Sequence, residues 1–367
     1  MTTTRGNVLA VVGAQYGSEG KGVIVNHIAN DYDVHVRVGG PNAGHSFYHQ
    51  QKLYKMQVIP CGWTNPNAIL VLGRGMVVDP HQLIEELEEI EKAAPDILLR
   101  LRIDPLAGLL HDGHHAEEGG IHGEIHQRIG STGHGVGAAR RERLDRDPSR
   151  TSLFGEVAAD YVASHGRWNL SDFLWSDTPG MLNSFIDEGT NVLLEGTQGS
   201  GLSLIHGPWP YVTSADTNAA QMAADVGLAP RLVNRTMLVA RTFPIRVAGN
   251  SGPLENEMTW DEMSERMGRP VLEQTTVTKK VRRVGAWDNE LFARACTLNR
   301  PTSVALTFAD YLDSSIAGTT DWAQLMASPE ILKYARNAAA IAGAPLTHIS
   351  TGGDFWSVAD NPVHFVP

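Results

Sequence analysis

The sequence predicts an α/β protein, a single large domain with a mainly parallel central sheet flanked by helices. Five short apolar runs carry this prediction, because each is typical of a strand that is buried on both faces of a sheet. Helical patterns lie between the runs, which favours parallel strands. No linker rich in proline or serine interrupts the chain, so we expect one domain over residues 1–367. The five runs are residues 8–12, 68–72, 191–194, 237–240 and 303–307.

The first run, residues 8–12, is followed by a glycine-rich turn over residues 13–22 and a helical pattern over residues 23–31. A strand, a glycine turn and a helix in this order open the nucleotide-binding units of α/β proteins. Residues 81–94 have apolar side chains at helical spacing and an acidic outer face, which indicates an amphipathic surface helix.

The composition argues against several classes of function. A formal net charge of −11 leaves no basic footprint for a nucleic acid, although local cations still allow small anionic substrates. The two cysteines, Cys61 and Cys296, lie far apart without metal-ligand spacing, which favours a reduced compartment. The N-terminus lacks the apolar core of a signal peptide, and no apolar run reaches the ~18 residues of a membrane helix. We therefore expect a cytoplasmic protein without nucleic-acid or membrane partners.

Residues 111–137 form a long polar segment that is rich in glycine and histidine. Inside a compact domain such a segment is usually functional or mobile. His122 and His126 have the spacing of two zinc ligands on one helix face. No cysteine or carboxylate accompanies the histidines in a zinc pattern, so we expect no dedicated metal site here. The histidines considered are His111, His114, His115, His122 and His126.

The glycine turn over residues 13–22 reads GAQYGSEGKG and suits an anionic ligand. Glycines let backbone N–H groups face an anion, the following helix adds the positive end of its dipole, and Lys21 adds a charge for phosphate. The turn is not a Walker A loop, because Gln15 stands where that loop has its first glycine. The alternative is an ordinary tight turn between a strand and a helix.

A second glycine-rich stretch, GGPNAGHS over residues 39–46, places His45 among small residues. Histidine exchanges a proton near neutral pH, so His45 is a candidate acid or base. A structural role is the alternative, since a lone histidine is more often structural than catalytic.

These two stretches, with further blocks in the same order, resemble the adenylosuccinate synthetases. The chain looks most like the compact archaeal and viral branch of that family. The resemblance implies the family's α/β fold and a magnesium-dependent ligase. The further blocks are IPCGW (59–63), LGRGMVVDP (72–80), IGSTGHGVG (129–137), EGTQGSGLSLIHGPWPYVTS (195–214), FPIRV (243–247), TTVTKKVRRVG (275–285) and ISTGG (349–353).

In that family a base removes the proton from purine N1, O6 attacks the γ-phosphate of a nucleoside triphosphate, and the amine of L-aspartate displaces the phosphate from C6. The resemblance implies that His45 is the acid that stabilises charge on O6 and the phosphoryl group, and that Ser18 and the Gly44 carbonyl hold Mg²⁺. Oriented cations around the transferred phosphoryl group are what this chemistry requires. The implied catalytic residues are Ser18, Lys21, His45 and Gln198.

The same resemblance implies three sets of binding residues. Arg146 would reach the nucleotide of a neighbouring subunit in a homodimer, and a solvated arginine is the alternative. The phosphoryl and triphosphate set is Gly17, Glu19, Gly20, Lys21, Gly22, Gly44, Asp310 and Gly352. The nucleotide monophosphate set is Asn42, Ser131, Thr132, Arg146, Gln198 and Thr213. The aspartate set is Thr276, Val277, Thr278, Lys280 and Arg282, where arginine forks suit carboxylates although Lys280 replaces a family arginine.

Position 18 departs from the family, which has an aspartate there that is both the N1 base and a magnesium ligand. Ser18 is a poor base but can still ligate Mg²⁺. Three explanations are open: an inactive nucleotide-binding regulator, an ordinary synthetase acting on IMP with another base, or an enzyme for another purine. Serine leaves room beside N1 for the 2-amino group of guanine. A serine at this position also resembles the viral 2-amino-deoxyadenylosuccinate synthases. Those enzymes use dGMP in making the 2-aminoadenine of certain bacteriophage genomes. We therefore predict dGMP and L-aspartate as substrates.

The donor site departs from the family too. Where the family reads guanine with Lys-x-Asp, this chain has Phe308, Ala309 and Asp310. An aromatic ring replaces the lysine that packs on guanine, so ATP or dATP is the predicted donor. The alternative is that Phe308 is an apolar residue at a strand end and that GTP still binds.

Overall fold

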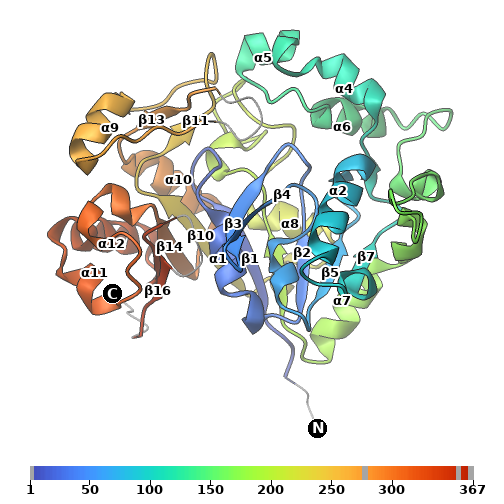
Figure 1. The fold of residues 1–367 in the computed structure, drawn as a ribbon, viewed down its shortest axis with the longest axis horizontal. Coiled ribbons are helices and arrows are strands. Elements are labelled where there is room, and N and C mark those ends of the chain that lie inside the picture. The colour runs from blue at the N-terminus through green and yellow to red at the C-terminus, as the bar shows by residue number, and fades with distance from the viewer. Residues whose placement is uncertain (1–3, 275–279, 353–356, 363–367) are drawn as a thin grey trace.

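The computed structural model describes residues 4–274, 280–352 and 357–362. Its central sheet consists of β1 (Val8–Gly13), β2 (Val34–Arg37), β5 (Ile69–Leu72), β7 (Leu101–Ile103), β9 (Val192–Glu195), β10 (Arg235–Arg241), β14 (Ser303–Thr307), β15 (Leu346–Ser350) and β16 (Val358–Asp360). The strands are ordered β16-β15-β14-β10-β1-β9-β2-β5-β7 (Figure 1). Neighbours are parallel except β15 and β16, which are antiparallel. The predicted α/β fold with a mainly parallel sheet is confirmed.

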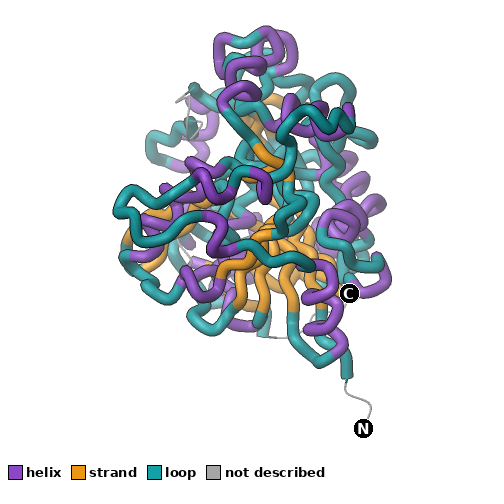
Figure 2. Tube along the Cα trace, turned by 90° about the vertical axis from the view of Figure 1, so that its right-hand side faces the viewer, coloured by secondary structure: helices purple, strands orange, loops and turns teal. Residues whose placement is uncertain are grey.

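The sheet is buried on both faces, as the continuous apolar runs predicted. Along β1, Val8 and Ala10 pack into one core while Leu9 and Val11 pack into the other. The first core contains buried side chains of α7 (Thr178–Asp187), α8 (Ala219–Asp225), α10 (Asn289–Asn299), α11 (Trp322–Ala327) and α12 (Pro329–Ala342). The second contains those of α1 (Lys21–His27), α2 (Pro80–Glu91) and α3 (Ile97–Arg100). Figure 2 shows the strands between helices on either side.

Smaller elements lie around the carboxyl edge of the sheet. They are the hairpin β3 (His45–His49) and β4 (Lys52–Met56), the pair β6 (Val77–Val78) and β8 (Gly108–Leu109), and the sheet β11 (Ile245–Arg246), β13 (Arg283–Gly285) and β12 (Glu257–Met258) with α9 (Trp260–Met267). Helices α4 (Asp112–Glu118), α5 (Glu124–Ile129) and α6 (Val136–Asp145) lie above the sheet in Figure 1. None of the described helices has the length and hydropathy that a membrane crossing requires.

The helix boundaries differ from the sequence predictions by a few residues. The helix predicted over residues 23–31 is α1, which begins earlier at Lys21 and ends at His27, with a short 3-10 helix at Ala29–Asp31. The helix predicted over residues 81–94 is α2, which begins at Pro80 because the Asp79 carboxylate caps it by accepting two backbone N–H groups. The polar segment 111–137 is largely helical. The single domain over residues 1–367 stays a prediction.

Candidate active site

A cleft of about 470 Å³ opens at the carboxyl edge of the sheet. The turn after β1, the loop after β2 and the loop after β9 meet there, and these three strands are neighbours in the sheet. Ligands of α/β proteins bind at this edge. Twelve predicted site residues line the cleft: Gly17, Ser18, Lys21, Asn42, Gly44, His45, Ser131, Thr132, Gln198, Thr213, Lys280 and Arg282.

Hydrogen bonds to Glu19 stabilise the conformation of the glycine turn. Its fully buried carboxylate accepts the backbone N–H groups of Gln15 at 3.0 Å and Gly17 at 2.9 Å. It also pairs with Lys21, whose Nζ lies 2.6 Å from both a Glu19 oxygen and the Gln198 carbonyl. A Cβ at Gly13 would lie 2.5 Å from the same carboxylate, so this position requires glycine. Glu19 therefore shapes the turn and places Lys21 at the cleft.

Ser18 lies at the top of this turn in the left-handed region, with φ of 59°. Its hydroxyl accepts a hydrogen bond of 2.5 Å from Arg282, a residue predicted to bind aspartate. Its carbonyl accepts a longer one, 3.3 Å, from the buried guanidinium of Arg241. Arg241 is paired with Glu273, which lowers the pKa of that carboxyl although burial alone would raise it. The turn and the aspartate-binding segment are thus joined through Ser18.

His45 is held by a buried carboxylate that the sequence interpretation had not assigned. Its Nδ1 lies 2.5 Å from Glu195 at the end of β9. Glu195 also accepts hydrogen bonds from Arg37 at 2.6 Å and from the backbone N–H of Cys61 at 2.7 Å. Burial and the nearby Arg37 lower the pKa of His45 to about 4. Although burial alone would raise it, Arg37 and the hydrogen bond from His45 lower the pKa of Glu195 to about 2.

At neutral pH this pair is therefore an anionic Glu195 and a neutral His45. Nδ1–H of His45 donates to the carboxylate, which leaves the Nε2 lone pair as the free position of the ring. Because His45 lines the cleft, the imidazole can accept a proton there before it can donate one. Glu195 favours the resulting imidazolium, but burial and Arg37 outweigh it, so the free ring is a weak base.

The cleft is positively charged although the chain as a whole carries −11. Among the described residues that line it, none is an aspartate or a glutamate. A surface of this kind attracts polyanions such as nucleotide phosphates and a dicarboxylate amino acid. Its cations are Lys21, Lys55, Arg246, Lys280 and Arg282.

The oxygen donors predicted for Mg²⁺ fit that ion. Ser18 and Gly44 both line the cleft, and a Cβ added at Gly44 would meet only Gln57 at 3.8 Å, so the position is open. Both donors are neutral, whereas Mg²⁺ in proteins usually has one or two carboxylate ligands in addition to substrate phosphates. An ion bound here would therefore take most of its ligands from the nucleotide, where it neutralises phosphate charge.

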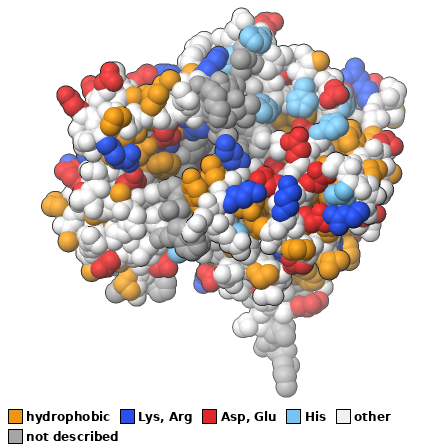
Figure 3. Space-filling view, viewed as in Figure 1, with side chains coloured by type: hydrophobic (Ala, Val, Ile, Leu, Met, Phe, Trp, Pro, Cys, Tyr) orange, Lys and Arg blue, Asp and Glu red, His pale blue; other side chains and the backbone are white. Residues whose placement is uncertain are grey.

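The polar segment 111–137 contributes to the cleft through α5 and the residues after it. Nδ1–H of His126 donates to the Ser131 carbonyl at 2.5 Å, and Nε2 lies 3.1 Å from Lys280. These contacts link the predicted phosphate-binding residues to the aspartate-binding segment. The sequence predicts no dedicated metal site at these histidines, and no role for His126 was predicted. Figure 3 shows histidines gathered on this face of the molecule.

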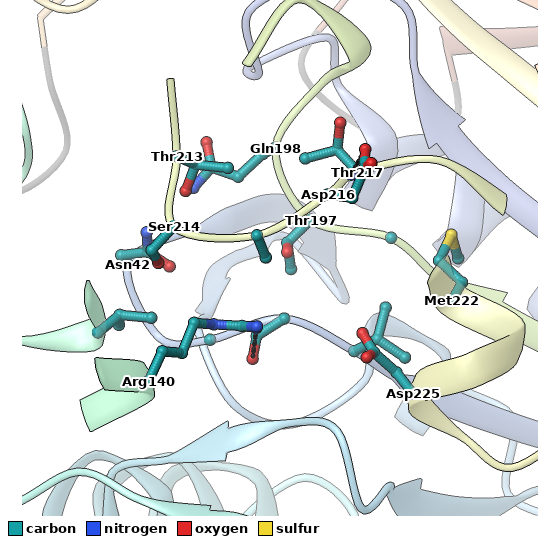
Figure 4. Close-up of a pocket in the computed structure, with 16 residues that line it drawn as sticks. Asn42, Arg140, Thr197, Gln198, Thr213, Ser214, Asp216, Thr217, Met222 and Asp225 are labelled. Atoms are coloured by element: carbon teal, nitrogen blue, oxygen red, sulfur yellow. Dashed lines mark hydrogen bonds between the residues drawn. The ribbon is translucent and has the colours of Figure 1, made fainter. Parts of the chain in front are cut away.

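A small polar pocket of about 20 Å³ adjoins the cleft and shares Asn42, Gln198 and Thr213 with it (Figure 4). Arg140 and Asp225 line it from α6 and α8. Within the described part of the chain, Nε of Arg140 has no hydrogen-bond partner. The volume suits one or two water molecules and is too small for a phosphate. The nucleotide phosphate therefore has to bind in the larger cleft.

Six predicted site residues within the described ranges do not line this cleft: Glu19, Gly20, Gly22, Arg146, Asp310 and Gly352. Gly20 and Gly22 lie in the turn and α1 behind it, next to Glu19, and a Cβ at Gly22 would lie 2.9 Å from that of His45. Arg146 is exposed at the end of α6. Asp310 and Gly352 follow the adjacent strands β14 and β15, and burial raises the pKa of Asp310 to about 6. The predicted aspartate ligands Thr276, Val277 and Thr278 lie outside the described residues.

Two aromatic contacts near the site were not anticipated. The guanidinium of Arg246 lies 3.9 Å from the ring centre of Tyr16, and both residues line the cleft. The guanidinium of Arg241 lies 3.9 Å from the ring centre of Phe308, beside the predicted donor site. Such contacts stabilise cations that have left water. The sequence did contain a signal for Arg246, because in the FPIRV block this charged residue directly follows the apolar residues 243–245.

Fold and site together define an α/β protein with a cationic cleft that suits anionic ligands such as nucleotide phosphates and carboxylates. The family model described as adenylosuccinate synthetase matches residues 10–165 and 167–317. The adenylosuccinate synthetases of Methanocaldococcus jannaschii and Methanococcus maripaludis are each 37% identical, over 95% and 93% of this chain and 95% of each relative. The chain belongs to the adenylosuccinate synthetase family and is a carbon–nitrogen ligase of that family.

Solved structures share the fold. A cyanophage S-2L succinoaminodeoxyadenylate synthetase bound to dGMP and dATP as an energy donor has a TM-score of 0.82 and 26% identity, over 98% of this chain and 97% of that one. A fully ligated adenylosuccinate synthetase from Plasmodium falciparum has a TM-score of 0.83 and 23% identity, over 97% and 100%.

Proposed function

We propose that the chain joins L-aspartate to C6 of dGMP, with ATP or dATP as donor, and forms 2-amino-2′-deoxyadenylosuccinate, ADP or dADP, and phosphate. The product belongs to the synthesis of 2-aminoadenine DNA in a bacteriophage. The observation that carries the proposal is Ser18, a small hydroxyl residue at the top of the glycine turn where the family has an aspartate. The cyanophage enzyme with the same fold was solved with dGMP and dATP, which supports both substrates.

The proton balance of the reaction uses His45. O6 of guanine bonds to the γ-phosphorus as the bond of that atom to the diphosphate breaks, and the N1 proton moves to Nε2 of His45 in the same step. Phosphorylation of O6 makes N1–H acidic, so a ring with a pKa of about 4 can accept this proton. The imidazolium, paired with Glu195, then stabilises charge on O6 and the phosphoryl group beside Lys21. The amine of aspartate, whose carboxylates are bound by Lys280 and Arg282, then bonds to C6. As the C6–O6 bond breaks, phosphate leaves with O6 and takes the proton from His45, while the amine releases its excess proton to water. This assignment removes the need for a carboxylate at position 18.

The preference for ATP or dATP as phosphoryl donor follows from the residues that come directly after β14. Phe308 occupies the position of the family lysine, and its ring is covered by the guanidinium of Arg241. The ring of Phe308 offers a flat apolar surface to a base and lacks the ammonium with which the family lysine packs on guanine. The charge of Arg241 lies against the ring and is paired with Glu273. Asp310 and Gly352 complete this donor-base region.

The test is phosphate release by the purified chain with Mg²⁺, L-aspartate and each pairing of dGMP, GMP or IMP with ATP, dATP or GTP. The proposal expects aspartate-dependent release with dGMP and an adenine donor, and mass spectrometry should find the succinylated 2-aminopurine nucleotide. Release on IMP alone would identify an ordinary synthetase, which the 37% identity to archaeal adenylosuccinate synthetases favours as the second candidate. No release with any pairing would leave an inactive nucleotide-binding regulator.

Mg²⁺ should bind the free chain weakly and bind at least about tenfold more tightly when ATP is present. The reason is that the described cleft residues supply neutral oxygens and no carboxylate, so the triphosphate has to provide the negative charge. Calorimetric titration of Mg²⁺ into the chain, with and without a nonhydrolysable ATP analogue, measures the difference. Equal, tight binding in both titrations would contradict this account of the metal ligands.

Arg146 acts on the partner subunit's nucleotide in the proposed homodimer, since it is exposed and outside its own cleft. Arg146→Ala and His45→Asn should each lack activity, and the mixture should regain it because one site of every hybrid dimer is intact. With random exchange of subunits, about a quarter of the wild-type sites are restored. Activity assays before and after mixing measure the recovery. If the mixture stays as inactive as its components, Arg146 does not act across subunits.

A further inference from the structure

Two histidine clusters lie outside the cleft, and hydrogen bonding decides which of them can hold a metal ion. In the first, His111 and His114 lie 3.7 and 3.5 Å from Glu142 through their Nε2 atoms. The Nδ1 atom of each ring accepts a backbone N–H, from Gly113 and from His111 respectively. The neutral rings therefore carry their protons on Nε2, facing the carboxylate. A metal ion would have to displace both protons, and these cannot move to the Nδ1 atoms because each already accepts a backbone N–H. This tautomer disfavours a metal here, although Nε2 of His114 has no hydrogen-bond partner among the described residues.

The second cluster joins three segments that are distant in the sequence. His27 ends α1, His348 lies in β15, and Asp360 is the direct cross-strand partner of His348 in β16. Nε2 of His27 lies 2.8 Å, and Nε2 of His348 lies 3.4 Å, from the same oxygen of Asp360. The shorter contact is a hydrogen bond that Nε2–H of a neutral His27 donates, so a metal ion would replace this one proton. The two imidazoles are mostly buried, with 19% and 14% exposed, while Asp360 is 65% exposed. None of the three lines the active-site cleft.

The hydrogen bonds of Thr347 fix the proton on His348. The Thr347 hydroxyl lies 3.3 Å from the Val304 carbonyl, to which it can only donate, and 2.7 Å from Nδ1 of His348. A hydroxyl has one proton, so both contacts are hydrogen bonds only when Nδ1–H of His348 donates to the oxygen of Thr347. Nε2 of His348 then has a lone pair that faces a carboxylate oxygen. Two acceptors in this position repel unless a cation, either a proton or a metal ion, lies between them.

We propose that His27, His348 and Asp360 bind a divalent transition-metal ion of the zinc class, with water as the remaining ligand. Zinc takes imidazole nitrogen and carboxylate oxygen at about 2.0–2.2 Å, so tetrahedral ligand atoms lie roughly 3.3–3.5 Å apart. The separation between His348 and Asp360 already has this value. The separation between His27 and Asp360 would have to grow by roughly 0.5–0.7 Å, a shift that the exposed Asp360 side chain can make. Thr347 orients the ring of His348 in the way that partners of metal-bound histidines do.

The site would tie α1 to the last two strands of the sheet. Because α1 carries the glycine turn at its other end, the ion would anchor the base of the helix that presents Lys21 and Ser18 to the cleft. Its role is structural, and its occupancy does not depend on the reaction that the chain catalyses.

The test is titration of Zn²⁺ into the untagged, chelator-treated chain, followed by calorimetry and by the thermal unfolding temperature. One ion per chain and a rise in that temperature are expected. His348→Gln should abolish both effects, and Thr347→Val should weaken zinc binding about 10–100-fold while leaving all three ligands in place. His111→Gln is the matched control and should bind as the wild type does. The proposal is overturned if the wild type binds no zinc, or if His348→Gln and Thr347→Val bind it unchanged.

Discussion

Glu195→Gln is expected to lower kcat by about 10²–10⁴-fold, the contribution typical of a positioned acid or base. The amide cannot stabilise an imidazolium on His45, and it leaves Arg37 without its buried counter-charge. The loss should fall on kcat and leave KM for dGMP nearly unchanged, because Glu195 lies behind His45 and does not line the cleft. Steady-state kinetics with phosphate detection separate the two parameters.

Removing a buried carboxylate also costs stability, so this variant needs a matched control. Asp104→Asn removes another fully buried carboxylate, which pairs with Arg74 at 3.2 Å and lies outside the cleft. It should lower the unfolding temperature without the loss in kcat. His45→Asn should reproduce the kinetic defect of Glu195→Gln, and the double variant should add little to it. A Glu195→Gln chain with unchanged kcat, or with a defect confined to KM, would remove His45 from the proposed proton path.

Ser18→Asp should lower kcat/KM for dGMP by about 10–200-fold relative to that for IMP, the discrimination typical of a small group that no longer fits. The longer side chain enters the space beside N1, where guanine carries its 2-amino group and hypoxanthine carries a hydrogen. It also gains a carboxylate next to Arg282, which now donates to the Ser18 hydroxyl. Competition between dGMP and IMP in one reaction measures the ratio directly.

The variant Ser18→Ala separates the effect of side-chain size at this position from the effect of the hydrogen bond to Arg282. It keeps the space and removes the hydroxyl, so the preference for dGMP should survive while Arg282 loses its acceptor and KM for aspartate rises. If Ser18→Asp reduces the use of both purines equally, the steric explanation of the substrate choice is wrong.

The sequence predicted the sheet better where strands are wholly apolar than where they carry buried charge. All five apolar runs became strands, but β2 was missed because His35 and Arg37 interrupt its pattern. Both side chains are fully buried. His35 bonds to the Ala29 carbonyl at 3.0 Å and Arg37 bonds to Glu195. The partner of His35 is only six residues away, whereas that of Arg37 lies on a distant strand. Hydrogen bonding makes both side chains compatible with the core, and the hydrophobic pattern does not contain that information.

The site shows the same division. The glycine turn, Lys21 and His45 were found from local motifs, and the structure brings them to one cleft. Glu195 lay inside a recognised block without a role, since only the fold places it against a histidine 150 residues away. The sequence did offer one indication that Glu195 belongs to the site, namely its position at the end of a buried strand. The carboxyl ends of parallel strands meet at the ligand-binding edge of the sheet.

The backbone at Ser18 adds a consequence for how this family diversifies. A left-handed φ of 59° is one that aspartate and asparagine adopt more readily than most residues with side chains. Serine and aspartate can therefore replace each other without altering the path of the main chain. One exchange at this position could therefore change the purine substrate of a ligase lineage. The rest of its sequence would stay similar to that of ordinary archaeal relatives. Overall sequence identity is then a poor guide to the substrate of each family member.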